Sequence, residues 1–81
     1  MTVSFSREAD EIFGELPEPV KRRAAHCIDL LSSYPRMYPV RRRGIMRGYR
    51  YFEAFGILFY YSVSSAEVRI CAIIPGRMRG A

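Results

Sequence analysis

The spacing of apolar residues changes once along the chain, at about Ile45. Before this point apolar residues recur every three or four positions, as on one face of an α-helix, except in a short strand-like stretch at residues 2–5. After it they alternate with other residues, as in half-buried β-strands. The pattern therefore predicts one strand, two helices and three further strands, in that order.

Both predicted helices carry start and stop signals. Ser6 is a suitable N-cap, and the first helix has an apolar stripe that ends at residues 14–17: Ala9, Ile12, Phe13 and Leu16. Pro19 suits the first turn of the second helix, and Pro35 stops it. Its expected buried stripe is Val20, Ala24, Cys27, Ile28 and Leu31. Since two or three residues separate the helices, we expect a helical hairpin.

The three later strands are predicted from Ile45 to Glu53, from Ile57 to Val63 and from Glu67 to Ile74, as an antiparallel meander. We expect the helices to cover the face that carries Ile57, Phe59, Tyr61, Val63, Val68, Ile70, Ala72 and Ile74. Glu53 is also placed on the helix side, paired with an arginine at the sheet edge. The opposite face would then show Leu58, Tyr60, Ser62, Arg69, Cys71 and Ile73. This mixture of apolar and cationic side chains is a candidate binding surface.

These elements predict a single α+β domain over residues 1–81, with a two-helix hairpin packed on one face of the sheet. Charge adds to this picture, because the net charge of +5 is unevenly spread. Residues 1–35 hold four bases and six acids, whereas residues 36–81 hold nine arginines and two acids. Such asymmetry favours an acidic partner, either nucleic acid or an acidic protein.

Other chemistry finds little support in the sequence. No apolar run approaches the roughly 20 residues that span a bilayer, and the N-terminus carries acids, so we expect a cytoplasmic protein. Cys27 and Cys71 are expected to be thiols that pack as small apolar residues. His26 beside Cys27 lacks the spacing of a zinc site. We therefore expect no metal ion and no cofactor.

Four segments resemble the RelE/ParE superfamily, the toxins of type II toxin–antitoxin modules. They are VSFSREADEIFGELPEPVKRR at the start, DLLSSYPRM at the end of the second helix, GYRYFEAFGILFYYSV in the strand pair, and VRICAIIPGRM in the last strand. The resemblance covers nearly the whole chain. It implies the strand–helix–helix–three-strand order and a cognate antitoxin as partner.

The resemblance offers two modes of action. The ParE-like branch binds DNA gyrase, and the RelE-like branch is a ribosome-dependent mRNA endonuclease, or mRNA interferase, that needs no metal. Arg50 and Arg77 match basic positions of the nuclease branch, but Phe52 and Leu58 stand where it has further basic residues, and its C-terminal tyrosine is absent. The chain therefore looks closer to ParE. The alternatives are a nuclease that uses Arg50, Arg77 and Tyr60, and an inactive member that only binds its antitoxin.

The arginines of the second half are the candidate contacts to target or antitoxin: Arg41, Arg42, Arg43, Arg50, Arg69, Arg77 and Arg79. The run at residues 41–43 is open to three interpretations: a solvated loop, a phosphate-binding patch, or a docking site for an acidic antitoxin segment. Arg50 and Arg77 are expected on the open part of the meander, where they would act in binding rather than in folding. The competing interpretation is an ion pair with Glu53 or Glu67 that braces the sheet edge.

Overall fold

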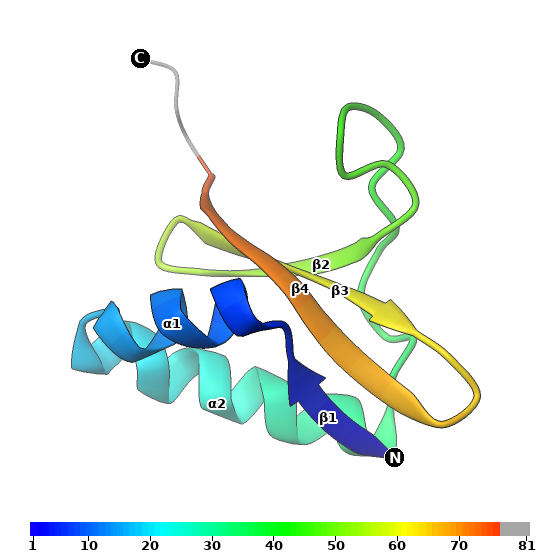
Figure 1. Ribbon diagram of the computed structural model, residues 1–81, viewed down its shortest axis with the longest axis horizontal. Coiled ribbons are helices and arrows are strands. Elements are labelled where there is room, and N and C mark those ends of the chain that lie inside the picture. Colours follow the sequence, from blue (N-terminus) through cyan, green and yellow to red (C-terminus); the bar gives the residue numbers. More distant parts are fainter. Residues whose placement is uncertain (77–81) are drawn as a thin grey trace.

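The computed structural model describes residues 1–76 and confirms the α+β class, with two helices and a four-stranded mixed sheet (Figure 1). Both helices lie on one side of the sheet. Neither helix in the described residues is long and apolar enough to cross a membrane. The elements are β1 (Thr2–Phe5), α1 (Arg7–Glu15), α2 (Glu18–Ser33), β2 (Arg50–Ala54), β3 (Ile57–Val63) and β4 (Glu67–Pro75).

The strands lie in the order β1-β4-β3-β2. The predicted antiparallel meander is present in the last three strands, where β2 pairs with β3 and β3 pairs with β4. The sequence predicts no neighbour for the first strand, and in the structure β1 pairs in parallel with β4, with Val3 opposite Val68. The α1–α2 hairpin makes this parallel pairing possible, because it carries the chain back across one face of the sheet.

The predicted helix signals act as expected. The Ser6 side chain accepts a hydrogen bond from the backbone N–H of Ala9 at 3.1 Å, which caps α1. Four members of the predicted α2 stripe are buried: Val20, Ala24, Cys27 and Leu31. The prediction for Ile12 is wrong, because this side chain is 41% exposed. The nine-residue α1 packs on the sheet through Ala9 and Phe13, whose ring lies 5.3 Å from that of Phe5, and leaves the Ile12 side open.

The hydrophobic core lies between the helices and the sheet. Phe59, Tyr61, Val68 and Ile70 are fully buried there against the α2 stripe. The Phe52 ring stacks on the Phe59 ring with centroids 4.9 Å apart. Complete burial of a side chain of this size contributes about 1.5–3 kcal/mol, so these five residues supply much of the stability of so small a domain.

A β-bulge changes the predicted faces of β4. Tyr60 pairs with Ala72, but Tyr61 pairs with Ile70, so Cys71 has no residue opposite it on β3. One extra residue reverses the alternation beyond it. Ile73 therefore joins the core, whereas Ala72 and Ile74 turn to the face without helices. The predicted faces of Ala72, Ile73 and Ile74 were wrong for this reason, and those of Val68, Ile70 and Cys71 agree with the structure.

The strand predicted to begin at Ile45 begins instead at Arg50. Residues 44–49 form two consecutive turns, closed by hydrogen bonds from Arg47 N–H to the Gly44 carbonyl and from Tyr49 N–H to the Met46 carbonyl. Gly44 and Gly48 have φ values of 85° and 94°, a conformation that favours glycine. The alternation of apolar residues from Ile45 onward therefore includes a turn, which the two glycines allow.

Candidate functional site

The sheet face that the helices leave open carries the first group of candidate residues. Tyr51 lies opposite Tyr60, with ring centroids 5.7 Å apart. Leu58 and Ser62, two residues before and two residues after Tyr60 on β3, lie on the same face. Glu53 lies opposite Leu58 on this same face and is exposed, so its predicted place on the helix side was wrong. The face is therefore an aromatic and aliphatic surface with polar residues at its margins.

Residues 39–50, here called the arginine hairpin, form the second group. An isolated bridge pairs Val40 with Arg50, and Tyr51 N–H donates to the Pro39 carbonyl at 3.1 Å. Arg41 N–H donates to the Tyr49 carbonyl at 2.7 Å. Residues 39–41 thus extend the sheet beyond β2, and the chain then projects as a free loop that stands away from the domain (Figure 1, green).

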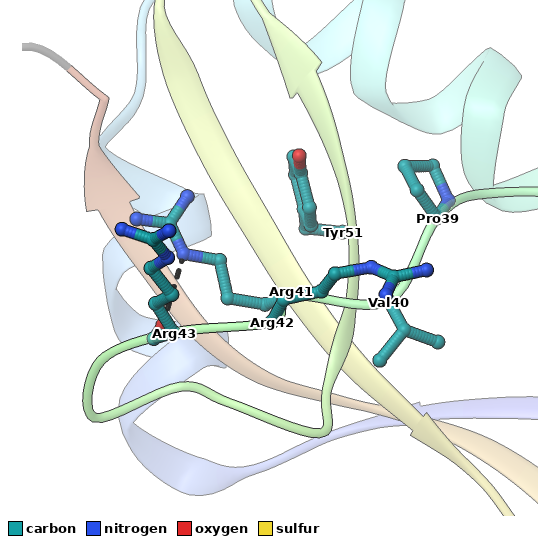
Figure 2. A pocket seen from close by; sticks show the side chains of 6 residues that line it. All are labelled: Pro39, Val40, Arg41, Arg42, Arg43 and Tyr51. Carbon is teal, nitrogen blue, oxygen red and sulfur yellow. Dashed lines mark hydrogen bonds between the residues drawn. The ribbon is translucent and has the colours of Figure 1, made fainter.

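The three consecutive arginines of the hairpin point in two directions (Figure 2). The Arg41 and Arg43 side chains lie together, joined by a hydrogen bond from Nε of Arg41 to the Arg43 carbonyl at 3.3 Å, whereas Arg42 extends the opposite way. The Arg41 guanidinium carbon lies 5.9 Å from the centre of the Tyr51 ring, within reach of a cation–π contact. These residues, with Pro39 and Val40, line an open hollow of about 460 Å³.

The positive charge of this region is not neutralised within the described residues. Residues 30–52 hold six arginines and no acid. Within residues 1–76 the ion pair between Lys21 and Glu18 is the single carboxylate contact within 4 Å of a basic side chain. Arg41, Arg42, Arg43 and Arg47 are therefore available to an external anion.

The apolar tip of the hairpin was missed by the sequence analysis. Ile45 is 94% exposed, the most exposed large apolar side chain of the described residues, and it lies between Arg43 and Arg47. The spacing of Gly44 and Gly48 around Ile45 was the signal that could have found it, because paired glycines at this distance are typical of a turn. The alternating apolar pattern outweighed that signal and predicts a strand that begins at Ile45.

Arg50 lies on the helix side of the sheet, opposite Tyr61, and not on the open face. Its Nη1 donates hydrogen bonds to the carbonyl oxygens of Tyr38 at 2.7 Å and Arg36 at 3.2 Å. The Tyr61 hydroxyl donates to the Pro35 carbonyl at 3.0 Å. Arg50 and Tyr61 together fix the segment that links α2 to the hairpin. The expected ion pair of Arg50 with Glu53 or Glu67 is not formed within residues 1–76. Arg50 instead stabilises the sheet edge through its hydrogen bonds to backbone carbonyls.

The other predicted arginines are scattered. Arg69 is exposed on β4, opposite Ser62 on the open face. Arg77 and Arg79 lie outside the described residues. Arg41, Arg42 and Arg43 therefore lie close together in the structure. The Arg50 side chain is separated from them, because it lies on the helix side of the sheet.

Tyrosines and cysteines near the core complete the inventory of reactive groups. Tyr60 is 4% exposed and packs against Tyr51. Burial, followed by a hydrogen bond with Cys27, raises the pKa of Tyr38 to about 12, and burial also raises the pKa of Tyr61. His26 is exposed on α2, and Cys27 and Cys71 are free thiols. In the part of the chain that the structure describes, no three His, Cys, Asp or Glu residues are grouped so as to hold a metal ion.

Comparison of the chain with protein-family models, with curated proteins and with solved structures gave no match.

Proposed function

We propose that this chain is the toxin of a type II toxin–antitoxin module, closer to the ParE-like than to the RelE-like branch. It inhibits growth by binding an essential target such as DNA gyrase, and a cognate antitoxin neutralises it. The observation that carries the proposal is the arginine hairpin, whose cations have no carboxylate partner in residues 1–76, beside the sheet face without helices, on which Tyr51 and Leu58 are half-buried. The order of strand, two helices and three strands supports the superfamily resemblance.

The residues that this chain has at the catalytic positions of the nuclease branch favour binding over catalysis. Phe52 is 4% exposed in the core, and Leu58 offers no proton donor or acceptor on the open face. Arg50 is engaged with two backbone carbonyls. Transfer of a proton from a ribose hydroxyl needs a positioned acid or base, and loss of one electrostatic stabiliser alone costs on the order of 10²–10³ in rate. A surface that offers cations and aromatic rings is better suited to recognition.

The antitoxin is expected to cover this surface with an acidic, amphipathic segment. Acidic side chains would meet Arg41, Arg42 and Arg43, and apolar ones would meet the half-buried Tyr51 and Leu58. Occupation of the surface by the antitoxin would exclude the target, so neutralisation and toxicity would compete for the same residues.

The proposal is tested by induced expression of the chain, alone and together with the product of the neighbouring gene. We expect growth arrest on expression alone and normal growth on co-expression, with the two proteins co-purifying. In parallel, a translation extract is examined for cleaved mRNA. A chain that is harmless and has no co-purifying partner would contradict the proposal, and ribosome-dependent mRNA cleavage would replace it with the interferase alternative.

A further inference from the structure

We propose that the arginine hairpin is an arm for duplex DNA, which lies in the minor groove with Ile45 at its tip as an apolar wedge against the base pairs. This inference concerns residues 39–50 alone and does not depend on the proposed toxin function. It begins from the combination within the hairpin of an isoleucine that is 94% exposed and four arginines: Arg41, Arg42, Arg43 and Arg47.

The arrangement of the cations suits a groove bounded by two phosphate strands. Arg41 and Arg43 project together to one side of the hairpin, and Arg42 projects to the other (Figure 2). An arm in a groove meets phosphates on both flanks, so guanidinium groups on both flanks are required. Arginine is also the side chain that inserts most readily into a narrow, A·T-rich minor groove, because the negative potential is enhanced there.

The tip has the form that a wedge needs. Gly44 and Gly48 take positive φ values of 85° and 94°, which allow the chain to reverse within a few residues and present Ile45 outward. No heavy atom beyond the chain neighbours lies within 4 Å of the position of a Cβ on either glycine, so the space beside both glycines is open. Proteins that bend DNA from the minor groove insert isolated apolar side chains of this kind between base steps.

Duplex DNA fits this tip better than an acidic protein does. The centre of a protein–protein interface is apolar and poor in charged residues, with the polar groups at its rim. Here Ile45 is the one large apolar side chain of residues 41–48 that is exposed, its neighbours Gly44 and the half-buried Met46 add little apolar area, and Arg43 and Arg47 follow on either side. A single apolar side chain between cations instead matches a minor groove, which has a phosphate backbone on each side and stacked base pairs at its bottom.

The test measures binding of the full-length protein to a short fluorescent A·T-rich duplex over a series of NaCl concentrations. Bending of the duplex is followed by energy transfer between dyes at its ends. The key variants are Arg42→Ala/Arg43→Ala and Ile45→Ala. The matched control is Arg22→Ala/Arg23→Ala, which removes the same charge from an adjacent pair of exposed arginines on α2. Circular dichroism verifies that all the variants are folded.

The two variants should have different effects. Loss of two phosphate contacts in Arg42→Ala/Arg43→Ala should reduce the slope of log affinity against log salt by about 1.8, whereas the α2 control should leave it unchanged. Ile45→Ala should keep the salt slope but abolish bending, because only the wedge unstacks the base pairs.

Three results would overturn the inference. One is equal loss of affinity in the hairpin variant and the α2 control, which would mean attraction by net charge alone. Another is unchanged DNA bending in Ile45→Ala. The third is preferential binding of a polyglutamate peptide or of single-stranded DNA over the duplex, which would identify the hairpin as a dock for an acidic protein or an unpaired strand.

Discussion

The guanidinium of Arg50 donates a hydrogen bond of 2.7 Å to the carbonyl oxygen of Tyr38, and a second bond from the same nitrogen reaches Arg36. Arg50 thereby ties the first strand of the meander to the segment that leaves α2. The sequence predicts that this arginine acts in binding on the open part of the meander. Its observed partners are backbone groups of the protein itself, so its first contribution is to the stability of the hairpin base.

Arg50→Ala is therefore expected to destabilise the fold by about 1.5–3 kcal/mol, the range for hydrogen bonds to a charged donor. The free energy of unfolding in urea is the measurement. Arg69→Ala is the control, because Arg69 is an exposed strand arginine, and its removal should change stability by about 0.5 kcal/mol or less. If both variants unfold at the same urea concentration as the wild type, Arg50 does not brace the segment.

The β-bulge at Cys71 predicts a contrast between two neighbouring isoleucines. Ile73→Ala should cost about 2–5 kcal/mol, because Ile73 is 5% exposed in the core. Ile74→Ala should cost about 0.5 kcal/mol or less, because Ile74 is on the open face and 38% exposed. Thermal or chemical denaturation of the two variants measures the loss of stability in each. Uninterrupted alternation along β4 predicts the reverse order, so a larger loss from Ile74→Ala would rule out the bulge.

Much of the fold followed from the sequence because local patterns and packing agree there. The α2 stripe is read correctly because a sixteen-residue helix repeats its period several times, and the Ser6 cap and Pro19 mark where the helices begin. The meander was predicted because each strand is bounded by glycine, serine or proline. The parallel partner of β1 could not be found, because a four-residue strand carries no information about its neighbour.

The candidate site was predicted less well than the fold, for two physical reasons. A bulge and a glycine turn each insert residues that leave the alternating pattern looking intact, so Ile73 was placed on the wrong face and Ile45 was placed in a strand. Arg50 is long enough to reach either side of a sheet, and its sequence position does not show which carbonyls accept from it. The run Arg41–Arg43 was identified correctly as a cluster, but the directions of its side chains required the structure.

Gly48 is expected to resist substitution although no atom crowds it. Its φ of 94° is unfavourable for any residue with a Cβ, so Gly48→Ala should destabilise the protein by about 1–2 kcal/mol. The matched control is Gly14→Ala in α1, where the space is equally open and the conformation is helical. That change should instead stabilise by about 0.5–1 kcal/mol. Thermal melting of the two variants should shift in opposite directions, and equal shifts would refute the proposed turn geometry.

The pKa of Tyr38, raised to about 12, predicts a loss of stability in alkali. The folded protein holds the phenolic proton more tightly than the unfolded chain, whose tyrosines ionise near pH 10, so the contribution is complete below pH 10 and declines as pH rises to about 12. Urea unfolding across this range measures the slope. Tyr38→Phe should flatten it, although part remains because burial also raises the pKa of Tyr61. An identical slope in Tyr38→Phe and the wild type would exclude Tyr38 as its source.

We propose that this chain stops growth by binding an essential target, with DNA gyrase as the first candidate. The most direct measurement is gyrase-catalysed supercoiling of a relaxed plasmid in the presence of the purified protein. We expect dose-dependent inhibition, relieved by the neighbouring gene product and weakened in Arg42→Ala/Arg43→Ala but not in Arg22→Ala/Arg23→Ala. Undiminished supercoiling at an excess of folded wild-type protein over gyrase would contradict it.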